Sequence, residues 1–192
     1  MSLSYHRRVK IYDEPVNDPS RSAFNPMSQS FVNDVNEIHR MTLDPEIKGS
    51  TYHPHSGRLL PVYYPPDRSS GNPDVWVVGG APNPETGARF PTHSVLSHQF
   101  SPRDVESNIM RTALSAHSSG DTTLSAGTWH VPKDPEDPTS GRVDLDVSDI
   151  HPEEKGAMKV ATQRGEEAIF GNQGAVEKFT IHSPRHPDYQ KK

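Results

Sequence analysis

Histidine is the residue type in this chain best suited to chemistry, because its imidazole titrates near neutral pH and binds metals. The sequence holds 11 histidines and no cysteine. His53 and His55 are two residues apart, a spacing that places both imidazoles on one face of a strand. A metal site needs at least a third protein ligand, and no further histidine follows before His93. The sequence therefore predicts no metal site and no cofactor.

Motifs for hydrolysis or nucleotide binding are absent from the sequence. It contains no Gly-x-Ser-x-Gly elbow, no P-loop, no Gly-x-Gly-x-x-Gly and no His-Glu-x-x-His. Glu166 and Glu167 are neighbours that point in different directions on a helix, so they do not predict a paired acid and base. We therefore expect no catalytic residue. The alternative is a small histidine-dependent hydrolase or nuclease of the toxin or effector type, using His53, His55, His93, His98 or His130.

Composition places the chain at the border between a globular and a disordered protein. Hydrophobic residues make up 31% of the 192 residues, and 19 prolines are spread along the chain. Proline interrupts helices and central strands, so long regular elements are not expected. A net charge of −5 argues against direct binding of nucleic acid, which requires an excess of Lys and Arg.

Targeting and membrane signals are also missing. The first ten residues, MSLSYHRRVK, are polar and charged rather than apolar, unlike a secretory signal. No apolar run approaches the length of a membrane span. We expect a soluble, non-secreted protein that is cytoplasmic or held within a particle or assembly.

The predicted fold class is α+β with low regular content, in which short strands and two to three short helices are joined by long extended proline-rich segments. The helices are expected at about 30–43, 101–117 and 152–170. Four regions follow from this pattern. They are an N-terminal extended arm with a short helix (1–48), an extended polyproline-type segment rich in Pro and Tyr (49–74), a small α+β region (75–181) and a flexible C-terminal tail (182–192).

Capping residues and apolar spacing carry the helix predictions. Ser101 can cap the second helix, Pro102 suits its first position, and Asp104 favours the positive end of the helix dipole. The third helix presents a shallow face made largely of alanine, with two internal glycines that weaken it. Such a helix needs a surface to pack against.

Strands are expected where apolar residues run together or alternate. VWVV at 75–78 is the most hydrophobic run and the best candidate for a buried strand. In the segment 141–147, Val143, Leu145 and Val147 alternate with Asp144 and Asp146, a pattern typical of a half-buried strand. Further strands are expected at 8–12, 122–131 and 176–181.

These features favour a non-enzymatic structural or interaction protein. We expect a component of a large assembly, such as a virus particle, a filament lattice or a multi-subunit complex, ordered largely by its neighbours. Its partners would be other protein subunits, further copies of itself included, and not a membrane. Two groups of residues would make the contacts: the anchors Tyr63, Tyr64, Val75 and Trp76, and a docking stripe of Ala157, Val160, Ala161 and Arg164. A further alternative is a regulatory adaptor that presents the segment 50–74 to a recognition domain.

Overall fold

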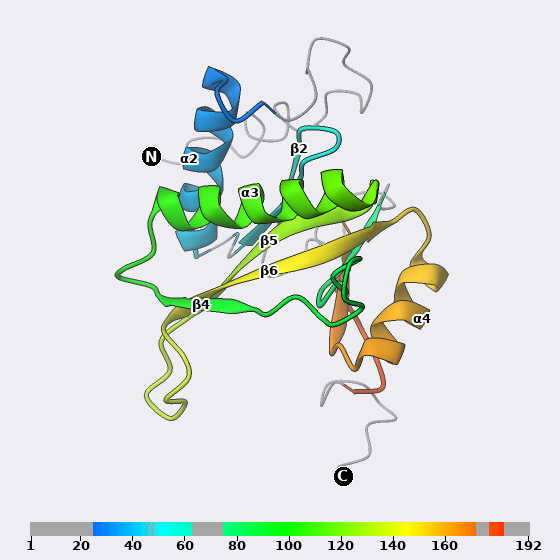
Figure 1. The fold of residues 1–192 in the computed structure, drawn as a ribbon. Coiled ribbons are helices and arrows are strands. Elements are labelled where there is room, and N and C mark those ends of the chain that lie inside the picture. The colour runs from blue at the N-terminus through cyan, green and yellow to red at the C-terminus, as the bar shows by residue number, and fades with distance from the viewer. Residues whose placement is uncertain (1–24, 46, 48, 63–74, 172–176, 183–192) are drawn as a thin grey trace, which may run out of the picture.

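A single antiparallel sheet organises the protein in the computed structural model, which describes residues 25–45, 47, 49–62, 75–171 and 177–182. Eight strands pair within these residues, in the order β2-β1-β5-β6-β3-β7-β8, with β4 also pairing with β6 (Figure 1). The strands are β1 (Gly49–His53), β2 (Arg58–Val62), β3 (Trp76–Val78), β4 (His93–Leu96), β5 (Leu124–Val131), β6 (Arg142–His151), β7 (Ala168–Gly171) and β8 (Glu177–Phe179). The α+β class predicted from sequence is confirmed.

Helix α3 (Pro102–Ser119) begins where its capping signal predicts, and helix α2 (Gln29–Leu43) begins one residue before its expected start at about residue 30. Helix α2 starts after Ser28, whose Oγ accepts a hydrogen bond from the Phe31 N–H at 3.1 Å. Helix α3 starts after Ser101, whose backbone N–H donates to the Asp104 carboxylate at 2.8 Å. Gly120 ends α3 at φ +70°, a conformation that favours glycine.

Helix α4 (Glu154–Arg164) is shorter than the predicted 152–170. Gly165 adopts φ +75° and its N–H bonds back to carbonyls of the last turn, which ends the helix. Ala168, expected on the helical face, instead opens strand β7, which pairs with β3 on one side and β8 on the other. Sheet pairing and the glycine cap thus override the helical spacing of the alanines.

The segment predicted to be extended and polyproline-like is in part a β-hairpin. Strands β1 and β2 pair from Gly49↔Val62 to His53↔Arg58, and Gly57 in the turn has φ +62°. Antiparallel pairing satisfies the backbone groups that a polyproline helix leaves to water. Tyr63 and Tyr64 lie outside the described residues, as does the strand expected at 8–12.

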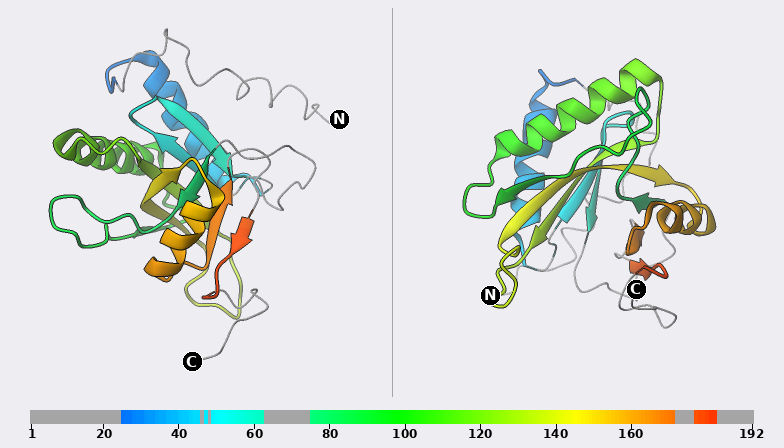
Figure 2. Two further views of the ribbon diagram at one scale, coloured as in Figure 1. Left: turned by 90° about the vertical axis from the view of Figure 1, so that its right-hand side faces the viewer. Right: turned by 60° about the horizontal axis from the view of Figure 1, so that its bottom comes forward.

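The apolar core lies between the helices and one face of the sheet. Helices α2 and α3 pack on β1, β5 and β6, where Ile38, Ile109 and Leu145 are almost fully buried. Helix α4 packs on β3 and β7, against Trp76 and Ile169. Figures 1 and 2 show α3 lying across β5 and β6, whereas α4 lies near the C-terminal end of β6. The described residues thus bury an apolar core of their own.

Strand register shows that all three helices cover the same face. In β6 the side chains of Val143, Leu145 and Val147 point to α3 or its neighbours. Asp149 continues this series and lies opposite Val78, which packs with α4. Since directly opposed residues share a face, no helix among the described residues covers the face that carries Asp144, Asp146 and Ser148.

The alanine stripe of α4 provides a test of this packing, because Gly156 and Ala157 are adjacent yet differ in surroundings. Ala157 is fully buried against the sheet, so Ala157→Leu is expected to destabilise by about 1–3 kcal/mol through overpacking. A Cβ added at Gly156 meets no atom within 4 Å, so Gly156→Ala is expected to stabilise by up to about 1 kcal/mol. Urea denaturation measures both. A near-neutral Ala157→Leu would show that the stripe is open.

Candidate binding cleft

The face of the sheet opposite the three described helices contains a cleft of about 600 Å³. Its floor is formed by Asp144, Asp146 and Ser148 of β6 and by their neighbours on β5 and β3. Its walls come from the segment before β4 and from residues 165–170, which follow α4. Residues that line it include Arg89, Trp129, Asp144, Asp146, Ser148, Glu166 and Phe170. The cleft therefore joins parts of the chain that are distant in sequence.

Asp146 occupies the middle of the floor, in space left by glycines. Gly127 lies directly opposite it on β5, and a Cβ at Gly127 would collide with the Asp146 carboxyl group. A Cβ at Gly79 would lie 3.2 Å from Asp146 Oδ2, tighter than ordinary contacts. The position of this carboxyl group thus depends on the absence of side chains on both sides.

Burial raises the pKa of Asp146 to about 6, and the nearby Asp144 carboxylate adds to the rise. A hydrogen bond from Ser148 Oγ, at 3.4 Å, and the more distant charge of Arg111 act in the opposite direction. No ion pair involves Asp146 in the part of the chain that the structure describes. Asp144, by contrast, is held by Arg142 at 2.7 Å and by Ser94 at 2.6 Å.

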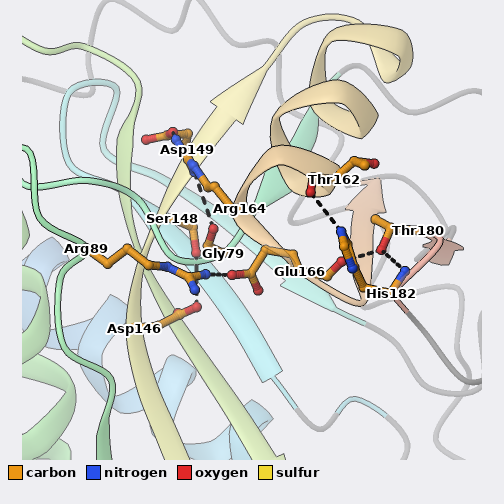
Figure 3. A network of polar contacts seen from close by, with 10 residues as sticks. All are labelled: Gly79, Arg89, Asp146, Ser148, Asp149, Thr162, Arg164, Glu166, Thr180 and His182. Atoms are coloured by element: carbon orange, nitrogen blue, oxygen red, sulfur yellow. Dashed lines mark hydrogen bonds and ion pairs between the residues drawn. The ribbon is translucent and has the colours of Figure 1, made fainter. Parts of the chain in front are cut away.

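Arg89 and Glu166 form an ion pair beside Asp146 (Figure 3). The Arg89 side chain is 53% exposed, and that of Glu166 is 25% exposed. Gly80 at φ +63° leaves room for the pair, since a Cβ there would fall against both partners. A Cβ at Gly79 would be near Glu166 Oε2 as well as Asp146 Oδ2. The carboxyl groups of Asp146 and Glu166 therefore both lie close to Gly79.

An aromatic pair forms another wall of the cleft. The rings of Trp129 on β5 and Phe170 on β7 have centroids 5.5 Å apart and an interplanar angle of 38°. Trp129 lies opposite Asp144, and Phe170 lies opposite Val77, so both rings share the face of the acidic floor. Aromatic surface beside carboxylates suits a ligand that is both apolar and charged.

Helix α3 supports the floor from the opposite face. The Asn108 side chain is buried, and its Nδ2 donates to the carbonyls of Gly127 and Asp146, each at 3.0 Å. Arg111 donates to Asn108 Oδ1 at 2.7 Å. Burial lowers the pKa of Arg111, and the charge of Asp146 opposes that shift. The Asn108 side chain thus links β5 and β6 beneath the carboxyl group of Asp146.

The interaction residues proposed from sequence lie elsewhere. Trp76, Ala157 and Ala161 are buried in the core, Val160 packs partly buried against them, and Val75 is half-buried. Arg164 pairs with Asp149 and donates to the Gly79 carbonyl at 3.3 Å. The alanines of the expected docking stripe are thus covered by the sheet of the same chain. Arg164 serves to join α4 to β6 and to the end of β3.

Of the histidines considered for catalysis, His53 and His55 lie near one another, with ring centroids 6.0 Å apart, but the group does not gather into one site. His53 contacts the Thr122 carbonyl and Ser56 Oγ, both at 2.7 Å. His55 lines a separate hollow beside the end of α3, while His93 and His98 are exposed. His130 follows Trp129 on β5 and so points to the opposite face from the cleft. Within the described ranges, no group of three or more potential ligands could hold a metal ion.

Sequence reasoning missed most of this cleft. The alternation of β6 did place Asp144 and Asp146 on a solvent-facing side. Glu166 falls within the helix predicted for 152–170, whereas in the structure it lies just beyond the Gly165 cap. Trp129 and Phe170 carry no local signal that brings them together.

Comparison with protein-family models, with curated proteins and with solved structures finds no match. The protein is therefore described by its architecture alone. It is an antiparallel sheet with the described helices on one face and a polar cleft on the other. None of the described helices has the length and apolar character needed to cross a membrane.

Asp144 and Asp146, the two aspartates of β6 that line the cleft, are expected to respond in opposite ways to neutralisation. The pKa of Asp146 is raised above its ordinary value of 3.8 to about 6, so the unfolded chain releases this proton first. The folded state therefore loses stability as pH rises from about 4 to 6, and the loss persists above that range. Asp146→Asn should stabilise the protein at pH 7.5, by about 1–3 kcal/mol, and flatten this pH dependence.

Asp144→Asn is the matched control, since it removes an ion-paired carboxylate two residues away. We expect it to destabilise the protein at pH 7.5 by about 1 kcal/mol. Urea denaturation between pH 4 and 8 measures both variants. Loss of stability in Asp146→Asn at neutral pH would contradict the assignment of Asp146 as a poorly solvated charge that destabilises the fold.

Proposed function

We propose that this protein is a non-enzymatic interaction component of a larger macromolecular assembly and that it binds another protein subunit in the cleft. The observation that carries the proposal is the face of the sheet that no described helix covers, where Trp129 and Phe170 lie beside a floor of carboxylates. Exposed hollows with aromatic walls and a polar rim are typical of protein interfaces. This proposal replaces the docking stripe with a different surface and keeps the same class of function.

The charges of the cleft support a protein partner over nucleic acid. Its described lining holds four carboxylates opposed by one arginine, namely Asp144, Asp146, Glu166 and Glu167 against Arg89. Such a surface repels phosphates, which need clustered Lys and Arg. It is consistent with the expectation of no direct binding to nucleic acid.

The alternative of a histidine-dependent hydrolase or nuclease gains no geometric support. His53 and His55 lie near one another by ring geometry, but the described lining of the cleft holds none of the five histidines named for it. Glu166 and Asp144 each form an ion pair with an arginine. Such pairing is typical of carboxylates that have a structural role. A catalytic carboxyl group needs access to a proton on a substrate.

Site-specific photo-crosslinking tests the proposed interface in the full chain expressed in its native cells. A benzophenone side chain placed at Thr92, an exposed residue of the cleft, is expected to crosslink to one defined subunit. The same group at Leu114, 62% exposed on α3, serves as the control and should not give that product. Mass spectrometry identifies the crosslinked subunit and distinguishes a second copy from another protein.

The double variant Trp129→Ala/Phe170→Ala should abolish the Thr92 crosslink and shift the protein to a smaller species in light scattering. Leu114→Ala should leave both unchanged. Circular dichroism checks that each variant is folded. An unchanged crosslink in the folded double variant, or equal crosslinking from Thr92 and Leu114, would refute the proposed interface.

A further inference from the structure

We infer that the group anchored in the cleft is a cationic side chain, lysine or arginine, of the partner protein. This inference rests on the proposed function and adds the chemistry of its ligand. It follows from four features of the described cleft: its charge, the carboxyl group without an ion pair on its floor, its aromatic wall and an arginine already bound at its edge.

The charge of the lining is complementary to a cation. Carboxylates outnumber guanidinium groups among the described residues of the cleft surface. Arg142 compensates Asp144, and Arg89 compensates Glu166. The remaining charge belongs to Asp146 on the floor and to the exposed Glu167. A ligand cation would therefore gain most from Asp146, where burial strengthens electrostatic attraction.

Asp146 has the surroundings of a built site and not those of a surface acid. The glycines at 127 and 79 leave space for its carboxyl group, and Asn108 fixes its backbone from below. Its one hydrogen-bond donor from another side chain in the described chain, Ser148 Oγ, is distant at 3.4 Å. The carboxyl group thus keeps acceptor capacity for a ligand while its position is fixed by packing.

The aromatic wall adds a second kind of contact with a cation. Trp129 and Phe170 line the same cleft as Asp146, and the faces of aromatic rings attract lysine and arginine side chains. The aliphatic part of either side chain can cover the rings while its charged end reaches the floor. A carboxylate beside paired aromatic rings is therefore suited to this ligand.

Arg89 shows that a guanidinium group fits at the edge of the cleft. It pairs with Glu166 next to Asp146 (Figure 3), and it is half exposed, so it can be displaced. An incoming cation competes with Arg89 for the negative potential of the site. Removing Arg89 should therefore strengthen the binding of a cationic ligand, whereas a site for anions would lose the arginine that lines it.

Protonation of Asp146 should weaken the binding of a cation as pH falls below about 6, the pKa of this group in the cleft. The charged groups near it are Asp144 on β6, Arg111 on α3, and Arg89 with Glu166 on the cleft walls. Of these, Asp144 and Glu166 are carboxylates held by arginines. The decrease near pH 6 is accordingly assigned to Asp146.

Small probes test the inference on the full-length chain. Nα-acetyl-arginine amide and Nα-acetyl-lysine amide are titrated at pH 7.5 while the two Trp indole N–H signals are followed by NMR, with Trp129→Phe to assign them. We expect saturable shifts of Trp129 but not of the buried Trp76. The uncharged citrulline and norleucine amides should bind at least tenfold more weakly.

Variants of the cleft then test which side chains bind the cation. Asp146→Asn should weaken cation binding at least tenfold, and Arg89→Ala should strengthen it severalfold. Glu136→Gln removes the same charge at an exposed site outside the cleft and should change nothing. Binding that is equal for citrulline and arginine amides, or that survives Asp146→Asn, overturns the inference.

The remaining outcomes also decide between ligand classes. If Arg89→Ala abolishes binding and Nα-acetyl-glutamate amide binds instead, the cleft takes an anion and the inference is wrong. If no charged amide binds while the Thr92 crosslink persists, the cleft is a protein interface without a cationic anchor. Loss of both would refute the proposed function together with this inference.

Discussion

The alternation of side chains along β6 is the constraint on which the rest of the structure depends. This strand pairs with β5 along one edge and with β3 and β4 along the other. Its Val143, Leu145 and Val147 are buried under the helices, while Asp144 and Asp146 face the cleft. A shift in register by one residue would exchange the two sets, burying carboxylates in the core. Core and cleft are therefore specified by the same strand.

The cleft floor shows how packing on one face controls chemistry on the other. Asn108 bonds to the carbonyls of Gly127 and Asp146 from the helical side. The missing side chain at Gly127 lets the Asp146 carboxyl group lie over β5. Enclosure then raises its pKa to about 6, because a charge in such surroundings is poorly solvated. Asp144, two residues away, has arginine and serine partners instead.

The walls of the cleft depend on where α4 stops. Gly165 ends the helix, so Glu166 leaves its axis and meets Arg89, and the chain returns as β7 to place Phe170 beside Trp129. Arg164, the last helical residue, holds this junction to Asp149 and Gly79. The alanine stripe earlier in α4 lets the helix approach β3 and β7 closely. A feature that resembled a docking surface thus serves the internal packing that shapes the site.

The sequence alone determined the features that rest on local physics. These are the starts of α2 and α3 at their capping serines, the buried run of β3 and the two-sided pattern of β6. The end of α4, the hairpin of β1 and β2 and the cleft were decided by tertiary structure. Caps and alternation act between residues a few positions apart, and the sequence displays them directly. Arg89, Trp129, Asp146 and Phe170 meet only because strand pairing brings distant segments together, and no local pattern records that meeting.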